Sequence, residues 1–126
     1  MSKSIFVSCV FEDAHHLLHL EKWAKNNLLG EGVAITHETI DNRPLGYDTI
    51  FNHLRPKING ASAILVLLGR DTHNHDWIRA EVELANSYHK KLIVARIPDT
   101  NGGIPSILAN KPIISLHPDS IRKALL

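Results

Sequence analysis

Short apolar runs alternate with longer amphipathic segments along the chain, and this alternation constrains the fold more than any other feature. Runs rich in β-branched residues predict strands at Ser4–Cys9, Gly32–His37, Ala61–Leu68, Lys91–Ile97 and Pro112–Leu116. The segments between them predict helices at Ala14–Leu29, Tyr47–Ile58, Asp76–His89 and Ser120–Leu125, with a further helical turn at Pro105–Ala109. Because parallel strands need crossover connections, the pattern predicts an α/β fold with helices on both faces of a parallel sheet.

The expected architecture is a flavodoxin-like three-layer sandwich with a five-stranded parallel sheet. The run ASAILVLLG is apolar on both faces and belongs near the sheet centre, whereas Pro112 places the last strand near an edge. A length of 126 residues with 44% hydrophobic residues fits one domain, expected over residues 1–126. Ligands of such sheets bind beyond the carboxyl ends of the strands. The segments of interest are therefore Cys9–Asp13, His37–Gly46, Gly69–Asp76 and Pro98–Gly103.

Charge and cysteine content exclude several classes of function. Fourteen Lys and Arg against thirteen Asp and Glu give a net charge of +1, so we expect neither nucleic acid nor a membrane surface as a partner. A single Cys excludes a disulfide framework and a Cys-rich zinc cluster, which fits a reducing compartment. The N-terminal residues lack the features of a secretory signal, and Ala63–Gly69 is too short to span a bilayer. We expect a cytoplasmic protein.

The histidines do not predict a metal site. His15, His16 and His19 can share a face of the first helix, and His73 and His75 precede the third. A zinc site would need further ligands, and neither Cys nor a carboxylate stands at a recognisable zinc spacing. We therefore expect no metal.

Glu81 is the most informative residue, because it falls on the apolar side of its helix. At about 100° per residue, Glu81 lies within an arc that includes Trp77, Ile78, Leu84 and Ala85, whereas Glu83 lies on the opposite face. A carboxylate among apolar side chains costs free energy unless it is paired or faces a cavity that a ligand fills. Two interpretations follow: a functional carboxylate near the crevice, or a residue at the margin of the arc that forms a salt bridge.

Three segments of the chain, in this order, resemble the Toll/interleukin receptor (TIR) domain family. IFVSCVFED resembles the opening box of these domains, and IDNRPLG resembles their loop after the second strand. AILVLLGRDTHNHDWIRAEVELA resembles the segment in which a Trp precedes the catalytic Glu by four residues, here Trp77 and Glu81. The similarity is closest to short TIR-like proteins of bacteria, including the NAD-consuming component of Thoeris anti-phage systems. The third TIR box, an aromatic pair near the C-terminus, is missing.

The resemblance implies cleavage of the bond between nicotinamide and ribose in NAD+, with NAD+ as substrate, no cofactor, and Glu81 as catalytic residue. It also implies self-association and a nucleotide signal, either a cyclic ADP-ribose isomer or an ADP-ribose conjugate, that acts on a separate effector protein. The expected substrate contacts are Ser8, Cys9, Phe11, Asp41, Asn42, Arg43 and Trp77. Backbone burial explains Ser8 and Cys9 equally well, and a core position explains Trp77.

The absence of single motifs argues against several functions that related folds have. A phosphoacceptor receiver needs an Asp where this chain has Gly69, and a flavodoxin needs a phosphate loop where this chain has CVFEDA. The dinucleotide fingerprint GxGxxG is absent, so NAD+ is not expected to bind in the Rossmann manner. Two alternatives stay open: a non-enzymatic TIR-like assembly module in which Glu81 is structural, and a nucleoside deoxyribosyltransferase-like enzyme that uses a Glu nucleophile.

Overall fold

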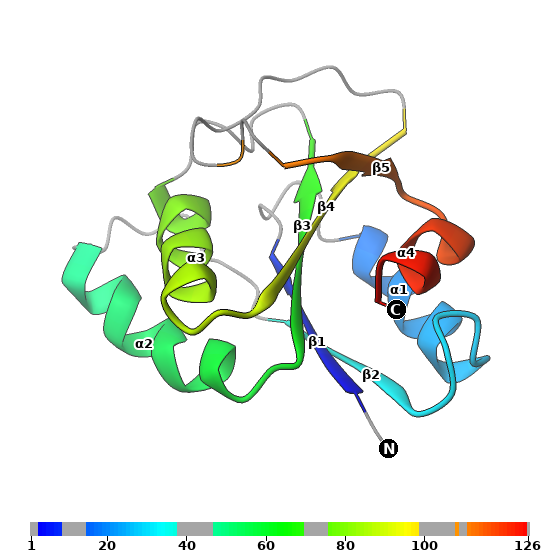
Figure 1. Ribbon diagram of the computed structural model, residues 1–126, viewed down its shortest axis with the longest axis horizontal. Helices are drawn as coiled ribbons and strands as arrows, with labels where there is room; N and C mark the ends of the chain where they lie inside the picture. Colours follow the sequence, from blue (N-terminus) through cyan, green and yellow to red (C-terminus); the bar gives the residue numbers. More distant parts are fainter. Residues whose placement is uncertain are drawn as a thin grey trace.

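The computed structural model describes residues 3–8, 15–37, 47–69, 76–98, 108 and 111–125 (Figure 1). Within these ranges, the side chains of residues 37, 47–51, 53 and 76–80 are outside the description. The elements are β1 (Lys3–Ser8), α1 (His16–Lys25), β2 (Val33–His37), α2 (Tyr47–Asn59), β3 (Ala63–Leu68), α3 (Asp76–Ser87), β4 (Lys91–Arg96), β5 (Ile113–Ser115) and α4 (Pro118–Leu125).

The five strands form one parallel sheet in the order β2-β1-β3-β4-β5. All six residues of β3 are buried, which confirms its central position, and β5 lies at an edge, as Pro112 predicts. Helices α2 and α3 lie on one side of the sheet, whereas α1 and α4 lie on the other (Figure 1). The predicted three-layer α/β sandwich with a five-stranded parallel sheet is confirmed.

Each face of the sheet has its own apolar core, because side chains alternate between the two faces of a strand. On the α2/α3 side, Phe6, Ile64 and Val66 pack against helix residues such as Leu54 and Val82. The core on the α1/α4 side consists of the alternate strand residues and of apolar residues from α1 and α4: Ile5, Val7, Leu65, Leu67, Ala95, Leu17, Leu20 and Ile121. Whether a residue has an odd or an even position along its strand thus determines which of the two cores its side chain enters.

Two predicted helices end earlier in the structure, and in both cases a residue with positive φ follows. The first was expected to reach Leu29 but ends at Lys25, and Asn27 has a φ of 60°. The third was expected to reach His89 but ends at Ser87, and His89 has a φ of 55°. The Lys90 N–H then donates to the Ala85 carbonyl at 2.9 Å, the pattern of a helix C-cap. Apolar periodicity does not detect such caps.

Other boundaries differ by local chemistry. The last helix begins at Pro118 and not at Ser120, since proline is compatible with the first helical turn. Strand β5 is limited to Ile113–Ser115 and excludes Pro112, which has no N–H to donate to a ladder. The predicted turn at Pro105–Ala109 lies outside the described residues except for Leu108, which is buried.

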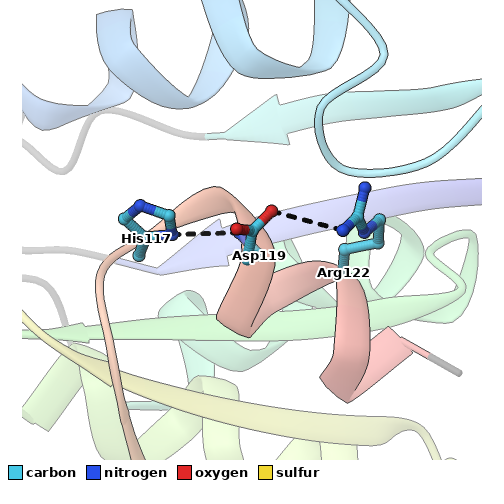
Figure 2. A network of polar contacts seen from close by, with 3 residues as sticks. All are labelled: His117, Asp119 and Arg122. Atoms are coloured by element: carbon cyan, nitrogen blue, oxygen red, sulfur yellow. Dashed lines mark hydrogen bonds and ion pairs between the residues drawn. The ribbon is translucent and has the colours of Figure 1, made fainter.

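Helix α4 is tied to the sheet and capped at its start. The Lys3 Nζ donates to the Leu125 carbonyl at 3.0 Å, which joins β1 to the end of α4. Figure 2 shows the other end, where the Asp119 N–H donates to Nδ1 of His117 at 3.2 Å and Arg122 pairs with the Asp119 carboxylate at 3.3 Å. None of the described helices is long and apolar enough to cross a membrane.

Candidate functional site

Glu81 is buried on the apolar side of α3. Only 1% of its surface is exposed, and Val82, Leu84 and Ala85 beside it belong to the core on the α2/α3 side. Glu83 is half-buried, and Asn86 and Ser87 are exposed. The predicted inequality of the two glutamates is therefore confirmed, and Glu81 does not lie at the margin of the apolar arc.

Helix α3 follows the carboxyl end of β3 in the chain, and Glu81 lies near the middle of this helix. The helix begins at Asp76, after β3 has ended at Leu68, so Glu81 lies about one and a half turns from the helix start. Glu81 also takes part in a polar or electrostatic interaction within the structure. The burial of Glu81 together with this interaction is compatible both with a structural ion pair and with a carboxylate held in place for a substrate.

Ser8 is the other buried polar side chain among the described residues, with an exposed fraction of 0%. It is the last residue of β1 and pairs in register with Val66 of β3. By alternation along the strand, Ser8 shares the side of Phe6 and therefore enters the α2/α3 layer, the layer that also contains Glu81. Two residues predicted by separate arguments thus belong to one layer.

The Ser8 hydroxyl has no hydrogen-bond partner within the described part of the chain. A buried hydroxyl in this state costs roughly 1–3 kcal/mol relative to a satisfied one. Its position at the carboxyl end of β1 is the place where sheets of this type bind ligands. A ligand hydroxyl or phosphate oxygen is a chemically suitable partner for it.

The remaining predicted site residues lie outside the described part of the structure. Trp77 belongs to α3, one turn before Glu81, but its side chain is not among those described. The other expected contacts fall between β1 and α1 or between β2 and α2, and they too are outside the described residues: Cys9, Phe11, Asp41, Asn42 and Arg43. Their roles stay predictions.

Three histidines gather at the start of α1, on the opposite side of the sheet from the core beside Glu81. The ring centroids of His15 and His16 are 4.1 Å apart, and those of His16 and His19 are 6.3 Å apart. Burial lowers the pKa of His16 from its ordinary value, and the charges of His15 and His19 lower it further. Across the described ranges, no group of three or more His, Cys, Asp or Glu residues could hold a metal ion.

Two hollows open on the described surface. One, of about 280 Å³, is lined by residues of β1, β2 and the end of α2: Ser4, Phe6, Thr36, Lys57 and Gly60. The other, of about 390 Å³, lies where β4 and β5 end, and it is lined by Arg96, Pro98, Ile113, Ile114, Ser115 and Leu116. From the sequence, only the segment from Pro98 onward is predicted to lie where ligands bind. Arg96 is not predicted to belong to such a site, although a charged residue at the end of a buried strand is a signal for one.

Comparison with known protein families gives one finding. The model of the family described as "Thoeris protein ThsB, TIR-like domain" matches residues 6–102, more than half of the chain. This range contains Ser8 and Glu81 together with all the other residues predicted to form the site. Comparison with curated proteins gives no significant match.

Proposed function

Since the chain belongs to the Thoeris ThsB TIR-like domain family, and is thus a TIR-like defence protein, we propose that it cleaves the nicotinamide–ribose bond of NAD+. The observation that carries the proposal is the burial of Glu81 on α3 in the layer that Ser8 also enters. A family resemblance and a helical-wheel argument both select this residue. Its environment is one in which a carboxylate interacts strongly with a developing positive charge.

The reaction needs little from the protein beyond one carboxylate. The bond between ribose C1′ and the pyridinium nitrogen breaks, and its electron pair neutralises the nitrogen, so nicotinamide leaves as a neutral molecule. No general acid is required. The positive charge that develops on the ribose resembles the transition state of glycoside hydrolysis. Glu81 beneath the ribose stabilises this charge and accepts hydrogen bonds from the sugar hydroxyls.

The second half of the reaction determines the product. When water attacks C1′, its oxygen forms the new bond, a proton is released and the product is ADP-ribose. When a nucleophile within the ADP-ribose or on a second molecule attacks, the product is a cyclic isomer or a conjugate. We propose that this product signals to a separate effector protein of the same defence system.

Ser8 fits a substrate-binding role in this scheme. Its buried hydroxyl donates to, or accepts from, an oxygen of the dinucleotide at the carboxyl end of β1. Cys9, Phe11 and Trp77 would complete the nicotinamide and ribose side, while Asp41, Asn42 and Arg43 would contact the adenosine or phosphate side. NAD+ enters this scheme as a substrate, and neither a metal nor a cofactor has a step in it.

Nicotinamide release from NAD+, followed by chromatography with mass spectrometry of the second product, tests the proposal. The assay compares the wild type with Glu81→Gln and with the matched control Glu83→Gln, for the protein alone and in lysate of phage-infected cells. We expect Glu81→Gln to lower turnover about 100-fold or more and Glu83→Gln to leave it unchanged.

Two results would contradict the assignment. Turnover that survives Glu81→Gln but is lost in Glu83→Gln would move the chemistry to the other carboxylate. Absence of nicotinamide release in both conditions would favour a non-enzymatic assembly module, in which the interaction that Glu81 makes within the structure is its purpose.

A further inference from the structure

The hollow at the ends of β4 and β5 has the composition of a site for a small organic anion. Of the six described residues that line it, only Arg96 carries a charge. Pro98 and Ile113 provide apolar surface, and Ser115 provides a hydroxyl; Ile114 and Leu116 also border the hollow, but their side chains pack against the core on the α1/α4 side. A cation beside apolar walls interacts more strongly with an anion than it would in open solvent.

The register of the strands brings the two polar side chains together. Arg96 of β4 pairs with Ser115 of β5, and residues paired in a parallel ladder direct their side chains to the same face. That face is the α2/α3 side, because Arg96 alternates with Ala95, which belongs to the other core. A guanidinium and a hydroxyl thus stand side by side on one face, at the last ladder positions of their strands.

The position and size of the hollow also fit a ligand. It lies where β4 and β5 end, which is the edge at which α/β sheets bind their ligands. Its volume of about 390 Å³ is within the range of small-molecule sites, at the lower end. Ile113 is 37% exposed, high for an isoleucine, and lines this hollow.

We propose that this hollow binds a small organic anion that joins a carboxylate or phosphate group to a compact apolar body. Arg96 binds the charged group, for which the planar guanidinium offers two parallel donors. Ser115 adds a third donor, and the isoleucine and proline walls contact the apolar body. Arg96 also has an interaction within the structure, with which the ligand would share it. Neither Glu81 nor Ser8 is among the described residues that line the hollow, and the proposal does not depend on the proposed cleavage of NAD+.

Titration of the ¹⁵N-labelled full chain, followed by two-dimensional NMR, tests the proposal with four probes. Benzoate and phenyl phosphate carry the two head groups on one apolar body, benzyl alcohol carries the body without charge, and inorganic phosphate carries the charge without the body. We expect saturable shifts of the Arg96, Ser115 and Leu116 amides with the first two probes. Benzyl alcohol and inorganic phosphate should bind about tenfold more weakly or worse.

Substitutions distinguish binding in this hollow from a nonspecific effect of positive charge and from binding at the proposed active site. Arg96→Gln should weaken the binding of both organic anions about tenfold, whereas Arg96→Lys should retain part of it. Ser115→Leu keeps the charge but fills the hollow from an exposed position, so it should block binding without unfolding the chain. Arg122→Gln, a matched change on α4, and Glu81→Gln should both leave binding unchanged.

The proposal is overturned if no saturable shift appears up to about 20 mM probe, a range that includes weak millimolar binding. It is also overturned if benzyl alcohol binds as well as benzoate, because the site would then be merely apolar. Unchanged binding in both Arg96→Gln and Ser115→Leu would place the ligand elsewhere. A loss of binding in Glu81→Gln would assign the anion to the proposed active site.

Discussion

Glu81 and Glu83 are two residues apart on α3, yet Glu81 is 1% exposed and Glu83 is only half-buried. The difference arises because two residues rotate the helix by about 200°, which places one side chain on the buried side of α3 and the other away from it. A glutamate therefore affects the free energy of unfolding differently at the two positions. Substitution by Gln, which keeps the shape and removes the charge, measures that difference.

Glu81→Gln is expected to fold, with a free energy of unfolding equal to that of the wild type or up to about 1 kcal/mol higher. A carboxylate kept in an apolar layer for function costs stability, and its removal recovers part of that cost. Urea denaturation followed by circular dichroism measures it, with Glu83→Gln expected within about 0.5 kcal/mol of the wild type. A loss of about 3 kcal/mol or more in Glu81→Gln would instead identify a structural ion pair.

Ser8→Ala is expected to leave the fold as stable as the wild type or to stabilise it by about 1 kcal/mol. The hydroxyl that it removes is buried and has no hydrogen-bond partner among the described residues, so no protein hydrogen bond is lost there. If Ser8 contacts NAD+, the same variant should raise KM for NAD+ several-fold. Urea denaturation and steady-state kinetics measure the two effects separately.

Ser62→Ala is the matched control for Ser8→Ala. The Ser62 hydroxyl accepts a hydrogen bond from the Ser4 N–H at 3.2 Å, so its removal should cost about 0.5–1 kcal/mol and leave KM unchanged. If Ser8→Ala were the more destabilising of the two, the hydroxyl would have a structural partner. The substrate-binding role would then lose its support.

The sheet and the burial of Glu81 could be predicted from the sequence because both follow from periodicity. An apolar run such as residues 63–68 has only one place in an α/β fold, at the sheet centre, and the wheel position of Glu81 turns it inward. The sequence alone does not predict the layer that the Ser8 side chain enters. This layer follows only from the structure, in which Phe6, two residues earlier on β1, faces α2 and α3.

What the sequence did not predict depends on contacts between distant segments or on single backbone angles. The ends of α1 at Lys25 and of α3 at Ser87 are followed by left-handed φ values at Asn27 and His89, which leave no apolar pattern in the sequence. The hollow beside Arg96 exists only because β4 and β5 pair with Arg96 opposite Ser115. These residues are 19 positions apart in the sequence, and no spacing rule joins them.

His16 should make the stability of the fold depend on pH in the mildly acidic range. Its pKa is lowered in the folded state by burial, and by His15 and His19, so the unfolded chain binds the proton more readily. Stability should therefore be full above the ordinary His pKa of about 6.5, fall as the pH drops below it, and stop falling below the lowered pKa. Urea denaturation of the wild type and His16→Gln between pH 5 and about pH 8 measures this contribution.

The difference between these two proteins isolates His16 from the other titrating groups. We expect the stability of the wild type relative to His16→Gln to decrease as the pH falls. A difference that is constant over this range would mean that the His16 pKa is the same in the folded and unfolded chains. A difference that increases as the pH falls would mean that a partner stabilises the charged imidazole.

Leu65→Ala should cost about 2–5 kcal/mol, because Leu65 is fully buried in β3, between β1 and β4, and a cavity there cannot collapse easily. Leu18→Ala removes the same atoms from α1, where the side chain is 70% exposed, and should change stability by less than about 0.5 kcal/mol. Urea denaturation of both variants gives the comparison. Equal losses would mean that Leu18 is covered in solution, and this would point to self-association through α1; sedimentation at several protein concentrations would then show an oligomer that Leu18→Ala dissociates.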